Sequence, residues 1–201
     1  MIGFASLKDS RNLMPPHGNI GLQRGTVKLV DHNLNWYECF KEEKELLLRI
    51  VGEKIVDVRH IGSTSIPGVP AKPIIDILAA VKALTDVEEF TENLQKFGYE
   101  DKGDAGVPGR RFFVKGEETN RTHHLNFCET NSEFWTSHLA FCHYLVRHPE
   151  TAEEYSLLKR ELADRFPMDR GAYTLGKEKF VRSVLEMAAN ESGCAPSDGK
   201  R

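Results

Sequence analysis

The chain has 201 residues, of which 40% are hydrophobic and 28% are charged. This balance predicts a packed soluble domain and excludes an intrinsically disordered chain, which has too few apolar residues to form a core. The formal net charge of −3 argues against a dedicated nucleic-acid-binding domain, because such domains are usually basic.

Cysteine usage and hydropathy point to a cytoplasmic protein. The cysteines are widely spaced and include no CxxC pair, which predicts free thiols rather than a metal finger or a disulfide framework. They are Cys39, Cys128, Cys142 and Cys194. No apolar run approaches the roughly 20 residues of a membrane helix, and residues 1–13 lack the apolar region of a signal peptide. We therefore expect no membrane partner.

The N-terminal part begins with a poorly patterned leader over residues 1–25. Residues 26–30 alternate between polar and apolar side chains, which predicts a short strand. Asp31 or Asn33 can cap the helix predicted over 34–51, whose apolar side chains fall on one face.

Two strands and a helix are predicted next. Residues 54–61 form the first strand, and 74–81 form an almost uninterrupted apolar strand that we expect at the centre of a sheet with both faces covered. An ordered connection over 62–73 joins them. Residues 85–97 predict a helix that Thr85 caps as part of a capping box.

The remaining pattern is a hairpin followed by helices. A glycine-rich loop over 103–109 leads into strands over 110–115 and 121–128, which are joined by a turn. The predicted helices that follow are 132–147, 150–166 and 172–190.

This order of elements predicts an α/β (α+β) fold, with a mixed β-sheet flanked by helices and a C-terminal helical portion, rather than a doubly wound sheet. We expect a single domain over residues 26–191 and a flexible tail over 192–201.

The Gly62-Ser63 corner between the first two strands is the first candidate site. Glycine allows close approach of the backbone, and Ser63, Thr64 and Ser65 supply hydroxyl and N–H donors, so the corner can form an anion-binding nest. The alternative is a tight turn in which a hydroxyl caps the following segment.

Asp76 interrupts the apolar strand over 74–81. A buried charge is costly unless it is paired or bound to a cation. An ion pair with Lys72, Arg59 or Arg111 is one explanation, and a Mg²⁺ ligand beside a phosphate is the other.

Two adjacent histidines, His123 and His124, lie on the strand predicted over 121–128. Side chains alternate along a strand, so the two histidines point to opposite faces and do not form a chelating pair. We expect His124 and Asn126 to share the face of Asp76, although a histidine on a strand is often only a structural hydrogen-bonding residue.

Basic residues elsewhere can complete a phosphate site. Arg111 and Lys115 share one face of a predicted strand with Phe113, which suits phosphate binding or, alternatively, a solvated edge. Tyr173 and Lys177 lie four residues apart at the start of the last helix, so both can point in one direction over an anion. The alternative is a packed tyrosine and a solvated lysine.

With these residues in hand, the chain resembles the GrpB family over about residues 26–190. This family consists of small domains of the nucleotidyltransferase superfamily, which also occur fused to dephospho-coenzyme A kinase. The resemblance rests on His60-Ile61-Gly62-Ser63-Thr64-Ser65-Ile66-Pro67-Gly68 and Ala71-Lys72-Pro73-Ile74-Ile75-Asp76-Ile77, and on residues 27–30, 36, 108–113, 122–125, 138–141, 148–149, 155, 158–159, 173–177 and 180.

The resemblance implies a nucleotidyltransferase-like fold in which Gly62 and Ser63 hold the nucleotide phosphates and Asp76 is the first metal-binding acid. The position of the second acid is Leu78, and the later strand offers His124 or Asn126 in place of a carboxylate. Two-metal transfer needs carboxylates that bridge the ions, so the acidic motif is incomplete.

The functional hypothesis is a protein that binds a nucleotide or another small phosphate-containing ligand, with Asp76 as the candidate catalytic residue. A divalent metal, Mg²⁺ or Mn²⁺, would be bound by Asp76 and His124. The predicted phosphate-binding residues are Gly62, Ser63, Thr64, Lys72, Arg111, His124, Tyr173 and Lys177. The alternatives are a catalytically reduced accessory module linked to coenzyme A metabolism, a nucleotidyl or phosphoryl transferase with one metal (Mg²⁺, Mn²⁺ or Zn²⁺), and a structural domain.

Overall fold

A five-stranded mixed sheet lies at the centre of the protein, with strands in the order β1-β2-β5-β4-β3. The computed structural model describes residues 20–191, so residues 1–19 of the predicted leader, the predicted tail and Cys194 lie outside the described part. The strands are β1 (Ile55–Ile61), β2 (Ile75–Val81), β3 (Tyr99–Asp101), β4 (Arg110–Lys115) and β5 (His123–Glu129).

The central position of β2 follows from its apolar sequence. It pairs antiparallel with β1 and parallel with β5, and β5 pairs antiparallel with β4. The register places Asp76 between Ile61 on β1 and His124 on β5. The only charged side chain of β2 therefore lies next to the polar end of β5.

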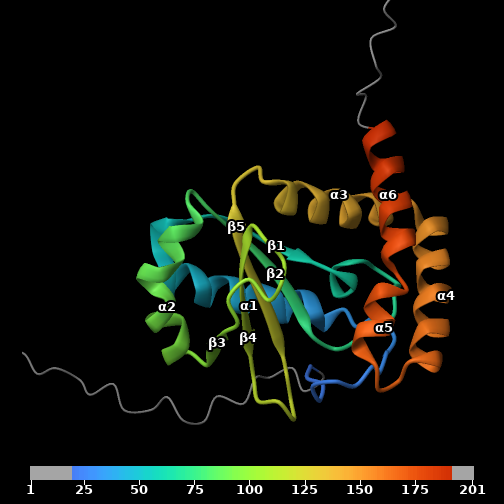
Figure 1. Ribbon diagram of the computed structural model, residues 1–201, viewed down its shortest axis with the longest axis horizontal. Helices are drawn as coiled ribbons and strands as arrows, with labels where there is room; N and C mark the ends of the chain where they lie inside the picture. The colour runs from blue at the N-terminus through green and yellow to red at the C-terminus, as the bar shows by residue number, and fades with distance from the viewer. Residues whose placement is uncertain (1–19, 192–201) are drawn as a thin grey trace, which may run out of the picture.

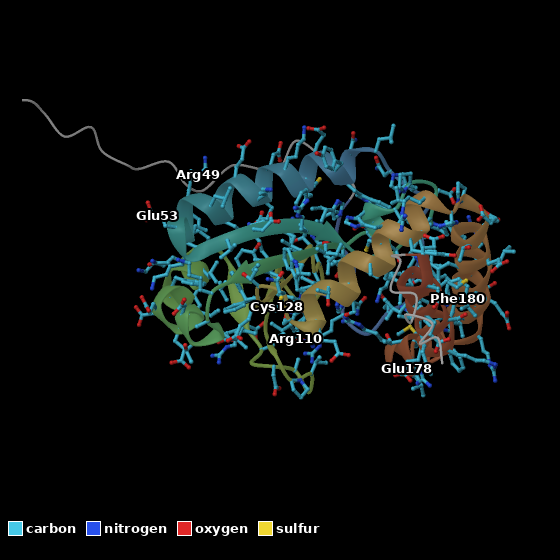
Figure 2. All side chains as sticks on the ribbon, turned by 90° about the horizontal axis from the view of Figure 1, so that it is seen from above. Arg49, Glu53, Arg110, Cys128, Glu178 and Phe180 are labelled. Atoms are coloured by element: carbon cyan, nitrogen blue, oxygen red, sulfur yellow. The ribbon has the colours of Figure 1, made fainter. Side chains whose placement is uncertain are left out.

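One face of the sheet is covered by α1 (Asn35–Val51) and α2 (Val87–Lys96). Figure 2 shows α1 on one side of the sheet and α3 (Glu133–Arg147) on the other. Trp36 and Leu47 of α1 are almost fully buried against this face, and each contributes about 1.5–3 kcal/mol of hydrophobic stabilisation.

The other face carries α3, and three further helices stand together at one end of the molecule (Figure 1). These are α4 (Pro149–Arg165), α5 (Arg170–Leu175) and α6 (Glu178–Glu191). Short 3₁₀ turns at Gly52–Lys54, Ser63–Ser65 and Leu84–Asp86 complete the elements. The predicted fold class, a mixed sheet flanked by helices with a helical C-terminal portion, is confirmed.

The predicted strand over 26–30 is wrong. Within it, only Val30 forms a bridge, to Ala71. Val27 packs instead against Leu162 and Tyr173, and its N–H donates to Pro167 O at 2.8 Å. The segment has the alternation of a strand because one side of it packs on the C-terminal helices.

Two helix predictions also need correction. Thr85 does not cap α2, because residues 84–86 form a 3₁₀ turn whose first N–H donates to Glu129 Oε1 at 3.0 Å. A carboxylate from the end of β5 thus holds the start of this turn, and α2 has no side-chain cap. The last predicted helix is two helices, α5 and α6, with Gly176 and Lys177 between them.

None of the helices within residues 20–191 is long and apolar enough to cross a membrane.

Candidate functional site

A cavity of about 880 Å³ lies between the α3 face of the sheet and the C-terminal helices. Its walls include residues from the Gly62 turn, β2, β4, β5, α4 and α5. In Figure 2, Arg110 on β4 and Glu178 at the start of α6, which both line the cavity, lie on the side of the sheet away from α1. All the predicted site residues except Arg111 line this cavity.

The turn after β1 brings the backbone against Asp76. Gly62 has φ 69° and ψ −173°, a conformation open in practice only to glycine. A Cβ there would lie 2.6 Å from Asp76 Oδ2. Ser65 N–H and Ser65 Oγ both donate to Gly62 O, at 3.1 and 2.7 Å, and so fix the turn.

Asp76 and His124 form a hydrogen-bonded pair across neighbouring strands. The distance from His124 Nδ1 to Asp76 Oδ1 is 2.8 Å. The Asp76 side chain is 34% exposed, to the space of the cavity, whereas His124 is buried. Burial opposes ionisation of Asp76, but the hydrogen bond from His124 and the charges of His124, Lys72 and Arg170 outweigh it and lower the pKa of Asp76. Asp76 is therefore an anion at neutral pH.

Two lysines lie against one aromatic ring opposite this carboxylate. Lys72 Nζ is 5.5 Å and Lys177 Nζ 4.4 Å from the centre of the Tyr173 ring. Burial and the charge of Arg170 lower the pKa of each lysine to about 8, although Asp76 opposes the shift. Lys177 lies over the Tyr173 ring as expected, but not from the same helix, because α5 ends at Leu175.

A third lysine, Lys159, is only 2% exposed and also lines the cavity. It donates a hydrogen bond to Pro70 O and lies 5.1 Å from the centre of the Tyr155 ring. Burial, together with the charges of Lys177 and Lys72, lowers the pKa of Lys159 to about 6. The neutral amine is therefore its main form at pH 7.

Tyr155 connects this lysine to the Gly62 turn. Burial raises the pKa of Tyr155 to about 12, and a hydrogen bond with Ser63 opposes the shift. The Ser63 hydroxyl and the Lys159 amine thus contact the same tyrosine from two sides.

Arg110, not Arg111, is the arginine of β4 in the cavity. Arg111 lies opposite Phe127 on the α1 face and makes a two-pronged ion pair with Asp101, with a shortest N–O distance of 2.6 Å. Arg110 donates to Asn126 Oδ1 at 3.0 Å and lies 4.7 Å from the centre of the Phe112 ring. The placement of Arg111 at the phosphate site is corrected accordingly.

Leu78, where the resemblance would place a second acid, is part of the core. It is fully buried in a cluster with Ile61, Cys128 and Cys142 beneath α3. An ionised side chain at this position would lose its hydration without gaining a partner. The packing of α3 on the sheet therefore occupies the place where a second metal-binding carboxylate would lie.

The donor atoms of Asp76 and His124 suit at most a metal ion that enters together with a bound ligand. Among residues 20–191, no three histidine, cysteine, aspartate or glutamate side chains gather as a metal site. Asp76 retains Oδ2 as a free carboxylate oxygen, but His124 Nδ1 is engaged with Oδ1. A shared metal on Asp76 and His124 would require this hydrogen bond to be replaced, and two bridged metal ions do not fit.

The sequence analysis missed four residues that line the cavity, namely Arg110, Tyr155, Lys159 and Arg170. For Tyr155 and Lys159 the sequence does contain a signal of burial. Ala152, Tyr155, Lys159 and Leu162 are all buried and recur at helical spacing along α4, so Lys159 stands in an otherwise apolar stripe. Because lysine is rarely buried without a partner, a lysine on the buried face of a helix indicates a paired or functional residue.

Both the sequence and the fold of the chain match known proteins. Residues 26–187 match the model of the family described as "GrpB protein". The crystal structure of conserved protein GrpB from Enterococcus faecalis is 35% identical with a TM-score of 0.77, and the match covers 82% of this chain and 99% of that one.

Two longer relatives match over about half of their own length. UPF0157 protein YqkA of Bacillus subtilis is 42% identical over 162 residues, which are 81% of this chain and 47% of YqkA. A protein called dephospho-CoA kinase, from Mycolicibacterium paratuberculosis, is 25% identical over 87% of this chain and 50% of its own length. From the family match and the E. faecalis structure, the chain belongs to the GrpB family.

Proposed function

We propose that the protein binds a small phosphate-containing ligand, of the nucleotide class, in the cavity between the Gly62 turn and α5. The observation that carries the proposal is the charge of the cavity wall. It has five basic residues, Lys72, Arg110, Lys159, Arg170 and Lys177, against two acidic ones, Asp76 and Glu178. Cations that lose hydration in a cavity are costly to the fold unless an anion accompanies them.

The lowered lysine pKa values support an anionic ligand rather than a cationic one. Lys72 and Lys177 both lose hydration and are both repelled by the charge of Arg170, which is why their protonated forms are disfavoured. A phosphate placed among them would reverse both effects, because it supplies opposite charge and strong hydrogen-bond acceptors. Binding would therefore restore the protonated state of the lysines.

The Gly62 turn has a complementary part in the proposal. The first N–H groups of a helical turn lack partners within the turn, and here those of Ser63 and Thr64 begin the 3₁₀ turn that borders the cavity. Together with the Ser63 hydroxyl they would hold phosphate oxygens beside Asp76 and His124.

A Mg²⁺ or Mn²⁺ ion that enters with the phosphates would be held by Asp76, because Mg²⁺ is commonly bound by one or two carboxylates together with substrate phosphates. Such an ion would neutralise phosphate charge near the carboxylate. Since Leu78 closes the second acidic position, we propose binding as the function and assign no transfer step.

A specific observation favours a second candidate, an accessory module of coenzyme A metabolism. The mycobacterial relative, half of which matches this chain, is named dephospho-CoA kinase. On this candidate the cavity would take a coenzyme A precursor, whose phosphates offer the same chemistry as those of a simple nucleotide.

Calorimetric titration tests the proposal and separates the two candidates. The titrants are ATP, ADP, CTP, pyrophosphate and dephospho-coenzyme A, each with EDTA and with Mg²⁺. We expect saturable binding of at least one of them. A preference for dephospho-coenzyme A over ADP would favour the accessory module, and no binding of any titrant at millimolar concentration would refute the proposal.

A pair of lysine variants supplies the site control. Lys177→Gln removes a cation of the cavity wall, and Lys179→Gln removes an exposed cation two residues along the same chain segment. Loss of a charge-assisted contact corresponds to roughly tenfold weaker binding or more. We expect this loss in Lys177→Gln and wild-type affinity in Lys179→Gln.

A further inference from the structure

A second cavity of about 300 Å³ adjoins the first. We call it the annex. It shares with the main cavity the residues Lys72, Ile74, Ala105, Phe112, His124 and Arg170. Lys72 and Arg170 therefore border both spaces, and a ligand held by these cations can extend into either.

The annex has its own set of cations. Arg24, Lys102 and Arg121 line it in addition to the shared basic residues, and its wall contains no aspartate or glutamate. Two of the three are engaged at the rim: Arg24 pairs with exposed Glu118, and Lys102 pairs with exposed Glu100. The annex is thus more one-sidedly basic than the main cavity.

Arg121 is the buried cation of this set. Its side chain is 7% exposed, and its one recorded ion pair within residues 20–191 is to Glu100 at 3.7 Å, which is longer than a hydrogen bond. A guanidinium carries five N–H donors in a planar fork suited to a phosphate or carboxylate. The long pair with Glu100 therefore leaves donors of this fork available to a further anion.

The position of Arg121 is fixed by its backbone. The N–H of Arg121 donates to Leu22 O at 2.9 Å, and the N–H of Leu22 donates to Arg121 O at 3.0 Å. The residues around it on the annex wall include the apolar side chains of Leu22, Phe112 and Val114. The annex therefore combines apolar walls with a buried fork of donors that extends from a fixed backbone.

We infer that the ligand of this protein carries two separate anionic groups joined by an uncharged segment. One group lies in the main cavity among Lys72, Lys177 and Ser63, and the second lies in the annex on Arg121, with Lys102 beside it. The uncharged segment passes Phe112, which lines both spaces. A nucleoside bisphosphate has this chemistry. This inference rests on the proposed function, because it adds a second subsite to the same ligand.

The test compares adenosine 5′-monophosphate with adenosine 3′,5′-bisphosphate by calorimetry in metal-free buffer. The readout is the ratio of the two dissociation constants, because a change in folding or in the main cavity affects both ligands alike. In the wild-type protein we expect the bisphosphate to bind about tenfold more tightly, as for one added charge-assisted contact. In Arg121→Met we expect a ratio near one.

Lys102→Gln provides a second variant at the rim, and it decides the question if circular dichroism shows that Arg121→Met is unfolded. We expect Lys102→Gln to lower the ratio. Arg49→Gln, on the exposed side of α1 (Figure 2), removes a cation far from the annex and should leave the ratio at the wild-type value.

The outcomes are separable. Equal affinities of the two nucleotides for the wild-type protein would overturn the inference and leave the proposed function intact. A preference for the bisphosphate that persists in a folded Arg121→Met and in Lys102→Gln would also overturn it. If neither nucleotide binds the wild-type protein and the wider titration finds no ligand, the proposed function and the inference fall together.

Discussion

Gly62 and Asp76 are so close that a Cβ on Gly62 would lie 2.6 Å from the carboxylate oxygen Oδ2 of Asp76. The turn and the carboxylate are therefore one unit, although 13 positions of sequence separate them. Glycine is therefore needed at position 62 for two reasons: its backbone conformation, and the space that its missing side chain leaves for Asp76.

Gly62→Ala should therefore destabilise the protein more than a glycine replacement that meets open space. Gly68 is the matched control, because its φ of 78° is similar but nothing lies within 4 Å of a Cβ there. We expect about 1–2 kcal/mol for Gly68→Ala from its positive φ, and about 1–3 kcal/mol more for Gly62→Ala from the collision with Asp76 and from the ψ of −173°.

Urea unfolding of the two variants measures both effects. Equal losses of unfolding free energy in Gly62→Ala and Gly68→Ala would contradict the contact between the turn and Asp76.

The turn and the carboxylate could be predicted from sequence because each is a local signal. A glycine followed by hydroxyl residues marks a tight corner, and one acid within an apolar run marks a buried charge. The contact between Gly62 and Asp76 could not be predicted, because it depends on the pairing of β1 with β2.

The stability of the protein should depend on pH through Lys159. Its pKa is about 6 in the folded protein against an ordinary value of 10.5. Between these values the unfolded state binds more protons, so stability rises with pH, by up to about 1.4 kcal/mol per pH unit. Lys159→Met removes this term and adds only a pH-independent offset from lost packing and from the lost bond to Pro70 O.

Urea unfolding from pH 6 to 8 should show the wild-type protein gaining stability relative to Lys159→Met as the pH rises. In this range Lys72 and Lys177, with pKa values of about 8, contribute less and contribute equally to both proteins. Lys179→Met, at an exposed position, should run parallel to the wild type. A constant difference between wild type and Lys159→Met would show that Lys159 keeps its proton on folding.

Asp76→Asn should distinguish direct anion binding from binding through a metal. The substitution preserves shape but removes the carboxylate that lies against Gly62 and pairs with His124. At pH 6.5 the protein should still bind ADP in EDTA, because Lys72 and Lys177 remain charged. Any strengthening of binding by Mg²⁺ should be lost. Abolished binding in EDTA would mean that the lysines alone do not hold the phosphate.

An aspartate in place of Leu78 should destabilise the fold rather than create a transferase. Leu78 is fully buried with Ile61 and Cys142 beneath α3. We expect Leu78→Asp to cost more than about 4 kcal/mol as an unpaired buried charge, whereas Leu78→Met should cost less than about 1.5 kcal/mol. Thermal unfolding of both variants checks this, and near-native stability of Leu78→Asp would show that α3 leaves room for a second metal ligand.

The arginines of β4 show where sequence reasoning reached its limit. Arg110 and Arg111 are adjacent residues of the same type, so the sequence does not show which of them faces the cavity. The register of β4 with β5, which aligns Arg111 with Phe127, decides the face of each. An error of one residue moves every side chain to the other face. Lys159 was missed for a different reason, because a helical stripe predicts burial but does not show which cavity the buried residue lines.

Calorimetric titration of ADP into the wild-type protein at pH 8, in EDTA and in several buffers of different ionisation enthalpy, tests the central claim most directly. At this pH the terminal phosphate is fully ionised, while Lys72 and Lys177, with pKa values of about 8, are about half protonated. An anion among them raises their pKa values, so the predicted result is saturable binding with net proton uptake. Absence of binding, or binding with no uptake of protons, would contradict a phosphate held by the buried lysines.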